Sequence, residues 1–115
     1  MSNLGVFLEK IKSNLKSISF DEVIAFIDEY YLFSPTMFKN GDQINDAGQN
    51  NGSCKIFYFS KINQLSESET LACFGKYYRI DVLNNPEGTD HQNIRNFMKF
   101  GWAGISFDGI ALSLK

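Results

Sequence analysis

Two side chains in this sequence have the chemistry of a catalytic pair: the thiol of Cys54 and the imidazole of His91, which is the only histidine. Cys54 follows Ser53, which we predict to be a helix N-cap, so the helix dipole would lower the thiol pKa and make it more nucleophilic. His91 would be the general base or proton shuttle. The sequence does not place the two in contact, and we favour the simpler interpretation that Cys54 is a small core residue.

Other polar side chains surround His91. Asp90 and Asn93 flank it, and Arg95 follows four residues later on the same face of a predicted helix. Because backbone N–H groups at a helix start suit an anion, these residues form a candidate anion-binding site. In the alternative interpretation, which we favour, Asp90 and Gln92 cap the helix while His91 and Arg95 are solvated or hold the Asn-rich loop in place.

That loop is the second candidate site. The stretch Asn40–Lys55 is rich in Gly and Asn, which permit backbone conformations closed to other residues, and such loops often carry function. Asn50 and Ser53 could bind a small polar ligand, or their hydrogen bonds could close the loop itself, which is the use we favour. A site requires that residues 47–53 and 89–95 meet in one pocket.

Composition excludes several classes of function. With 115 residues, a net charge of −2 and only two arginines, the chain has the size of one domain and lacks the basic surface of a nucleic-acid-binding protein. Two cysteines and one histidine are too few for a structural zinc site. We expect no metal, no cofactor and no membrane span, and the N-terminus lacks a secretory signal, so we expect a soluble protein made in the cytoplasm.

Five helices are expected from apolar spacing and end signals. Two of them start with clear capping boxes, in which Ser19 pairs with Glu22 and Ser66 pairs with Glu69. The helix from Ser66 should run unbroken to the region of Asn84–Pro86, where proline stops it. The others cover Leu4–Leu15, Ser53–Leu65 and the segment from Thr89 to Gly101, although a strand through Ile56–Phe59 competes with the third helix.

Two hairpins are expected from their turn dipeptides. With Asn40-Gly41 as the turn, Lys39 faces Asp42 and Met37 faces Ile44. With Asp108-Gly109 as the turn, Phe107 faces Ile110 and Ile105 faces Leu112, which puts four apolar side chains on one face. The expected fold class is therefore α+β, a single compact domain with a small antiparallel sheet that both hairpins share. The cysteines Cys54 and Cys73 should lie too far apart for a disulfide.

Three long strings then point to a family. They are AGQNNGSCKIF (Ala47–Phe57), TLACFGKYYR (Thr70–Arg79) and GTDHQNIRNFMKFGWAGISFDG (Gly88–Gly109). Through them the whole chain resembles the HopJ family, named for type III effectors of plant-pathogenic bacteria. The resemblance implies a single HopJ-like domain over residues 1–115 and export into a host cell by type III secretion. It carries no catalytic residue or ligand over to this sequence.

Two hypotheses of different kinds follow. In the first, which we favour, the chain is a non-enzymatic interaction module that binds a partner protein. In the second, it is a small enzyme or an anion- or small-ligand-binding protein that uses Cys54, His91 and Arg95 beside the Asn-rich loop. The two differ in whether Ser53, Cys54, His91 and Arg95 converge on one pocket.

Overall fold

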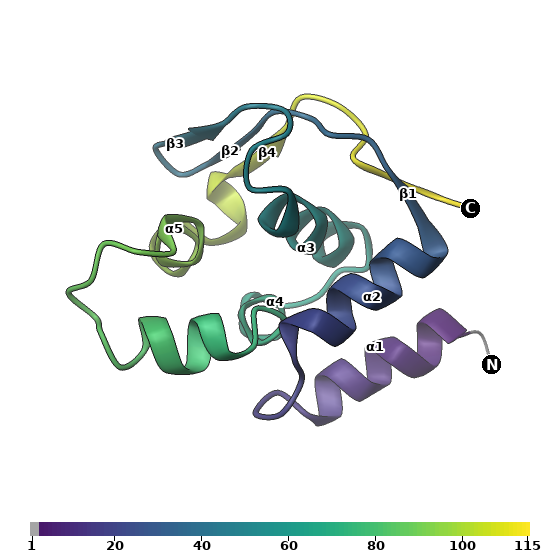
Figure 1. Ribbon diagram of the computed structural model, residues 1–115, viewed down its shortest axis with the longest axis horizontal. Helices are drawn as coiled ribbons and strands as arrows, with labels where there is room; N and C mark the ends of the chain where they lie inside the picture. Colours follow the sequence, from purple (N-terminus) through teal and green to yellow (C-terminus); the bar gives the residue numbers. More distant parts are fainter. Residues whose placement is uncertain (1–2) are drawn as a thin grey trace.

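The helix α3 (Asn51–Ile62) is the centre of the molecule, and the other elements are arranged around it (Figure 1). The computed structural model describes residues 3–115. Buried side chains occur at neighbouring positions of α3, such as Ile56 with Phe57 and Phe59 with Ser60, so more than one face of the helix is covered. The helix prediction is therefore confirmed over the competing strand.

Two helices, α1 (Asn3–Ser13) and α2 (Phe20–Tyr30), lie side by side along one side of α3 (Figure 1). They join the core through aromatic rings. Phe7 of α1 stacks on Phe26 of α2 with ring centroids 4.2 Å apart, and both rings approach Phe59 of α3 edge-on. This cluster buries large apolar areas that stabilise the helical side of the fold.

Both predicted capping boxes are present. At the start of α2, the Ser19 hydroxyl accepts from the Glu22 backbone N–H at 3.1 Å, and the Glu22 carboxylate accepts from the Ser19 N–H at 3.0 Å. At the start of α4 (Glu67–Ala72), Ser66 and Glu69 exchange the equivalent bonds at 3.1 and 2.8 Å. These two helices therefore begin where local sequence dictates.

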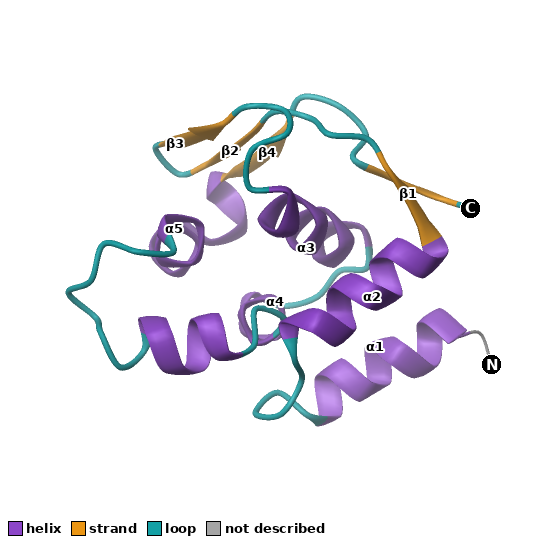
Figure 2. Ribbon diagram, in the orientation of Figure 1, coloured by secondary structure: helices purple, strands orange, loops and turns teal. Residues whose placement is uncertain are grey.

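The prediction of one long helix after Ser66 is wrong. The chain turns at Gly75, whose φ is +59°, and resumes as the π-helix η1 (Tyr77–Val82). A side chain at Gly75 would meet the backbone nitrogen of Phe20 at 2.7 Å, so the close approach of α2 requires glycine there. The break gives η1 a direction different from that of α4 (Figure 2).

The sheet contains the strands β2 (Phe38–Asn40), β3 (Gln43–Asn45) and β4 (Ile105–Phe107), in the order β3-β2-β4. The first hairpin exists, but the predicted register is wrong: the partner of Lys39 lies two residues further along the chain than predicted. Lys39 pairs with Ile44 and Asn40 pairs with Gln43, which leaves Gly41 as the first turn residue at φ +64°. This register turns Phe38 and Asn40 into the interior.

The second predicted hairpin does not form. The strand β4 pairs with β2, whereas β5 (Leu112–Leu114) pairs with β1 (Tyr31–Phe33) (Figure 2). Both ladders have the same register, so a single antiparallel alignment relates residues 31–40 to residues 105–114, with paired strands at its two ends. The ladder is interrupted around Pro35, which has no N–H to donate. Ile110, expected on the buried face, is 69% exposed.

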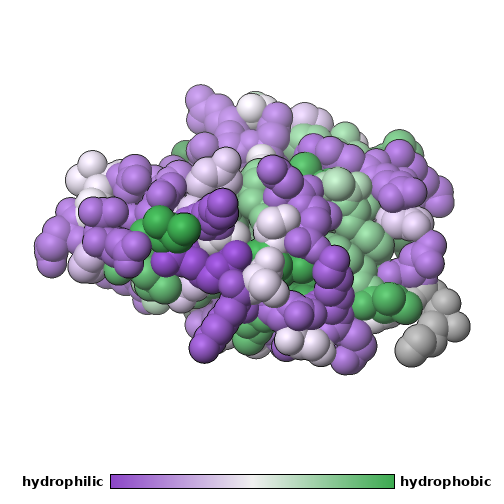
Figure 3. All heavy atoms as spheres, turned by 60° about the horizontal axis from the view of Figure 1, so that its bottom comes forward, coloured by the Kyte–Doolittle hydropathy of each residue, from purple (hydrophilic) through white to green (hydrophobic). Residues whose placement is uncertain are grey.

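The remaining elements close the fold beneath the sheet. Helix α5 (Gln92–Phe100) contacts β2 and α4, and its end at Gly101, where φ is +62°, confirms the predicted stop. The 3-10 turn η2 (Gly101–Gly104) leads into β4. On the face formed by α1 and η1, hydrophilic side chains are interspersed with smaller apolar areas (Figure 3). The predicted α+β class with a small antiparallel sheet is confirmed.

Candidate functional site

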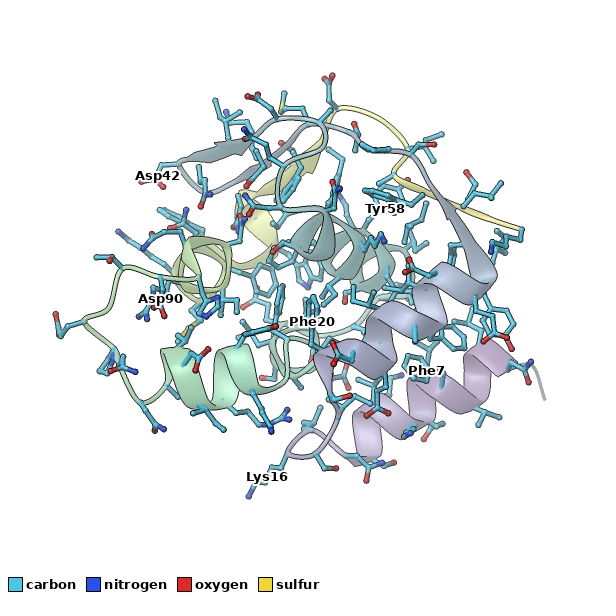
Figure 4. All side chains as sticks on the ribbon, in the orientation of Figure 1. Phe7, Lys16, Phe20, Asp42, Tyr58 and Asp90 are labelled. Atoms are coloured by element: carbon cyan, nitrogen blue, oxygen red, sulfur yellow. The ribbon has the colours of Figure 1, made fainter. Side chains whose placement is uncertain are left out.

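A cleft of about 510 Å³ opens where the starts of α3 and α5 approach each other. It joins the Asn-rich loop to the segment around His91, which the sequence alone could not establish. The start of α2 and the π-helix η1 supply the opposite wall, and Phe20 projects from α2 toward this region (Figure 4). The lining residues are Phe20, Gln43, Asn50, Gly52, Ser53, Phe74, Tyr77, His91, Gln92, Asn93 and Ile94.

Both helices that open into the cleft begin with a left-handed residue and no side-chain cap. These residues are Asn50 at φ +52° before α3 and His91 at φ +50° before α5. Ser53 is therefore the third residue of α3, and its predicted role as N-cap is wrong. Within the described chain, no hydrogen bond engages the backbone N–H groups of Gly52, Ser53 or Gln92. They are available to a ligand in the cleft.

Buried amides fix the positions of these two helix starts. Asn45 and Asn93 exchange a reciprocal pair of amide hydrogen bonds, at 2.9 and 3.2 Å. Asn40 donates to the side chain and the carbonyl of Asn93 at 3.0 and 2.8 Å. Asn50 donates to the Asn45 carbonyl oxygen at 2.7 Å. The network thereby ties the hairpin, the start of α3 and the start of α5 into one unit.

Several polar atoms at the cleft have no partner inside the described chain. The Gln43 side chain donates to Asn45, but its Oε1 is buried and accepts nothing. The amide groups of Asn50 and Gln92 likewise donate internally, to Asn45 and to the Thr89 carbonyl, while no protein hydrogen bond reaches their oxygens. The cleft therefore presents amide oxygens as acceptors beside backbone N–H donors.

The opposite wall is aromatic. Phe20 lies against Phe74, with centroids 6.4 Å apart, and meets Tyr77 edge-to-face at 5.1 Å. Tyr77 is 42% exposed, so part of its ring is open to solvent. A side chain at Gly52 would meet the Phe20 ring at 2.9 Å, which explains why glycine occupies this position.

The π-helix η1 connects this aromatic wall to His91. The ring of its first residue, Tyr77, has its centroid 5.2 Å from that of the His91 ring, and the Asp81 carboxylate, one turn later, lies within hydrogen-bond distance of His91 Nε2, at 3.1 Å. The Asp90 carboxylate lies 3.7 Å from the same nitrogen. A π-helix is rare and often marks a functional site. Here it places Tyr77 and Asp81 on the side of η1 that faces His91.

Cys54 does not join this site. It is 1% exposed in the core, and its Sγ lies 4.0 Å from the Thr36 carbonyl oxygen. Burial raises the pKa of the Cys54 thiol, which is the opposite of the lowered pKa expected for a nucleophile at a helix start. Cys73 is also buried and free, and burial raises its pKa to about 12.

Arg95 and Asp90 also lie outside the cleft lining. Arg95 donates to the Asp90 carboxylate at 2.6 Å, to the Asp90 carbonyl at 2.6 Å and to the Asn85 carbonyl at 2.8 Å. The bond from Arg95 holds the pKa of Asp90 below its ordinary value. Arg95 thus closes the loop before α5, while Asp90 does not cap that helix.

Of the six predicted ligand-binding residues, four line the cleft: Asn50, Ser53, His91 and Asn93. Sequence reasoning does not find Gln43, Phe20 or Tyr77. Helical spacing assigns Phe20 to a buried face, and the break at Gly75 that exposes Tyr77 has no signal beyond the glycine itself. Throughout residues 3–115, no group of three His, Cys, Asp or Glu side chains could hold a metal ion.

A comparison with protein-family models shows the family of this chain. A family model described as HopJ type III effector protein matches residues 4–112. The crystal structure of VPA0580, a protein of unknown function, is 51% identical, with a TM-score of 0.96 over 99% of this chain and 95% of that one. None of the curated proteins matches. Because the family model spans nearly the whole chain, this protein belongs to the HopJ family of type III effector proteins.

Proposed function

We propose that this HopJ domain is a non-catalytic recognition module that holds a small, uncharged polar ligand in the cleft between α3, η1 and α5. One observation carries the proposal. The Cys54 thiol and the Arg95 guanidinium are withdrawn from the cleft, while unpartnered amide oxygens, backbone N–H groups and aromatic rings converge on it. Such a lining binds and orients a ligand without supplying a thiol nucleophile or a fixed positive charge.

Amide NMR spectra of the ¹⁵N-labelled protein, titrated with a library of uncharged fragments, test this proposal. Binding should move the resonances of Gly52, Ser53 and Gln92 in a saturable way. A Ser53→Phe variant should lose the response, because its ring fills the cleft. The matched control is Asn51→Phe, which adds the same ring at an exposed position of α3 outside the cleft lining.

Two results would contradict the proposal. One is a library in which no fragment moves these three amides. The other is a fragment response that survives in Ser53→Phe, which would put the bound fragment elsewhere on the molecule.

A second candidate function, binding of a partner protein, is supported by a different surface. A groove of about 280 Å³ lies between the end of η1 and α5, lined by Val82, Leu83, Pro86, Arg95, Met98 and Lys99. Leu83 and Met98 are 47% and 46% exposed there. Exposed apolar side chains that cluster in a groove favour protein contact. Replacing both with Lys should abolish co-purification of a partner if the groove is the interface, and retained co-purification would exclude it.

The family also bears on where the protein acts. Membership of a type III effector family supports export into a host cell rather than service in the cytoplasm where the chain is made. Nothing in the described helices is long and apolar enough to cross a membrane. A fusion to a reporter enzyme that is active only inside host cells should give a signal with a working secretion apparatus and none without it. An equal signal in both strains would argue against export by this route.

A further inference from the structure

The charges around the cleft offset one another. None of the described residues that line it is an aspartate, glutamate, lysine or arginine. The starts of α3 and α5 carry the positive ends of their helix dipoles, whereas Asp81 and Asp90 place negative charge behind His91. Neither an anion nor a cation gains a net advantage from such a field, which favours an uncharged ligand.

The hydrogen-bonding groups at the cleft require a ligand that both donates and accepts. Asn50 and Gln92 are exposed residues whose amide oxygens accept no hydrogen bond from the described chain, so they can accept from a ligand. The Gln43 Oε1 also has no protein partner, but protein atoms cover it. The backbone N–H groups of Gly52 and Ser53 need acceptors. A hydroxyl group does both at once, so a ligand with several neighbouring hydroxyls meets every one of these requirements without carrying charge.

The geometry of the aromatic wall selects against a flat heterocycle. The planes of Phe20 and Tyr77 meet at 77°, and those of Tyr77 and His91 at 41°, so neither pair forms a parallel slot that would sandwich a base. Phe20 and Phe74 are closer to parallel, at 27°, but Phe74 is buried and offers no open face for a base. Tyr77 instead offers one partly open ring. The negative face of an aromatic ring attracts the polarised C–H groups along one side of a sugar ring.

We propose that the cleft binds a neutral saccharide, with one sugar ring packed on Tyr77 and its hydroxyls bonded to the amide oxygens and to the N–H groups at the start of α3. This inference rests on the recognition function proposed above and names its ligand class. The inference covers a free sugar and the end of a glycan on a protein alike, since both present the same hydroxylated ring.

The test titrates the ¹⁵N-labelled protein with neutral disaccharides: maltose, cellobiose, lactose and chitobiose. At least one should move the amide resonances of Gly52, Ser53 and Gln92 to saturation. Tyr77→Ala should weaken that binding by about tenfold, the effect of one lost ring contact, whereas Tyr77→Phe keeps the ring and should remain within about threefold. Ile80→Ala, on the same π-helix but outside the cleft, should bind like the wild type.

A second arm separates the two sources of the sugar. The protein is mixed with a glycoprotein that carries the responding sugar, before and after enzymatic removal of the glycan. Binding that disappears with the glycan identifies the protein-linked form, and binding of the disaccharide alone identifies the free form. Either result supports the inference.

Three results would overturn it. No saturable shift with any disaccharide at about 50 mM, far above a millimolar Kd, would exclude saccharides. If uncharged fragments still bind under those conditions, the recognition function stands and only the ligand class fails; if they do not, both fail. Saturable binding of phosphate or of an alkylammonium salt in the cleft, in place of sugars, would refute the neutral ligand. Full disaccharide affinity in Tyr77→Ala would refute the placement on that ring.

Discussion

Helices α2 and α4 begin with complete capping boxes, whereas α3 and α5 begin at Asn50 and His91 with left-handed backbone and no side-chain cap. In the first pair the serine side chain accepts from the N–H of the third helical residue, Glu22 or Glu69. In the second pair no side chain caps the helix, and both starts open into the cleft. Local capping rules are thus followed at α2 and α4 and broken at the two helix starts that meet at the cleft.

The largest effect should come from the buried amides that hold the two uncapped helix starts together. Asn93→Leu removes three side-chain hydrogen bonds, one with Asn40 and two with Asn45, although Asn40 keeps its bond to the carbonyl of residue 93. Loss of these buried bonds should lower the free energy of unfolding by about 3 kcal/mol. Urea denaturation measures it. Asn51→Leu, at an exposed position, is the control and should change little. A loss below about 1 kcal/mol would mean that the network does not hold the two starts.

The next effect separates capped from uncapped starts directly. Ser19→Ala and Ser66→Ala should each lower the free energy of unfolding by about 1 kcal/mol, because each deletes a cap. Ser53→Ala, which resembles a cap in the sequence but lies inside α3, should stay within about 0.5 kcal/mol of the wild type. Thermal or urea unfolding of the three variants compares them. Equal losses in all three would erase the distinction between the two kinds of start.

Backbone strain at the α5 start should appear as a difference of about 1 kcal/mol between two variants. His91→Ala and His91→Gly both delete the imidazole, but only alanine is disfavoured at φ +50°, so the glycine variant should be the more stable. At Asn96, inside the same helix, Asn96→Ala should be more stable than Asn96→Gly, because glycine is the poorer helix former. The same order at both positions would show that the left-handed conformation at His91 is not retained.

The smallest effect concerns the pH dependence of the capped start of α2. Burial raises the pKa of Glu22, but hydrogen bonds from Lys10 and Ser19 outweigh it and hold the pKa below its ordinary value. Because the pKa is lower in the folded state, the ionised carboxylate stabilises the fold at pH values above the unfolded-state pKa of about 4.3. This stabilisation is lost as the pH falls through the folded-state pKa.

Glu22→Gln should therefore remove a small part, under about 1 kcal/mol, of the stability lost on acidification, since the carboxylate is partly exposed. Lys10→Met should remove part of the same acid-dependent loss of stability, because it deletes one of the groups that lower the Glu22 pKa. Urea midpoints measured between about pH 3 and pH 6 report it. An unchanged pH profile in Glu22→Gln would assign the acid sensitivity to other groups.

Features set by neighbouring residues could be predicted from the sequence. The boxes at Ser19 and Ser66 depend on residues three positions apart, and the apolar faces of α1 and α2 depend on spacing within each helix. The break at Gly75 is different, since the glycine is required by the approach of Phe20 from far along the chain.

The sheet could not be predicted, because long-range pairing outweighs local turn signals. Asp108-Gly109 favours a hairpin, yet the C-terminal segment pairs instead with β1 and β2, in two ladders of three residue pairs each. The register at Asn40-Gly41 shifts because Asn40 enters the buried amide network. In both cases the partner is distant in sequence: β1 and β2 for the C-terminal strands, and Asn93 for Asn40.

The candidate site residues also fall into two groups: those that the fold brings to the cleft and those that it does not. Asn50, Ser53, His91 and Asn93 have the polar character of a site and do meet in the cleft. Cys54 and Arg95 have the more reactive side chains. The N-cap of α3 lies at Asn50, three residues earlier than predicted, and Cys54 faces the core, while the loop before α5 engages Arg95. Residue type suggested the chemistry, while backbone placement decided which residues are available for it.

The pairing of residues 31–40 with residues 105–114 also bears on the order of folding. β1 has no strand partner other than β5 in the described chain, and Tyr31 and Phe38 each pair with a residue more than sixty positions away. Pairing over such a distance closes a long loop, whereas each helix forms from contacts within a few residues. Both ladders are therefore expected to form after the helices have collected around α3.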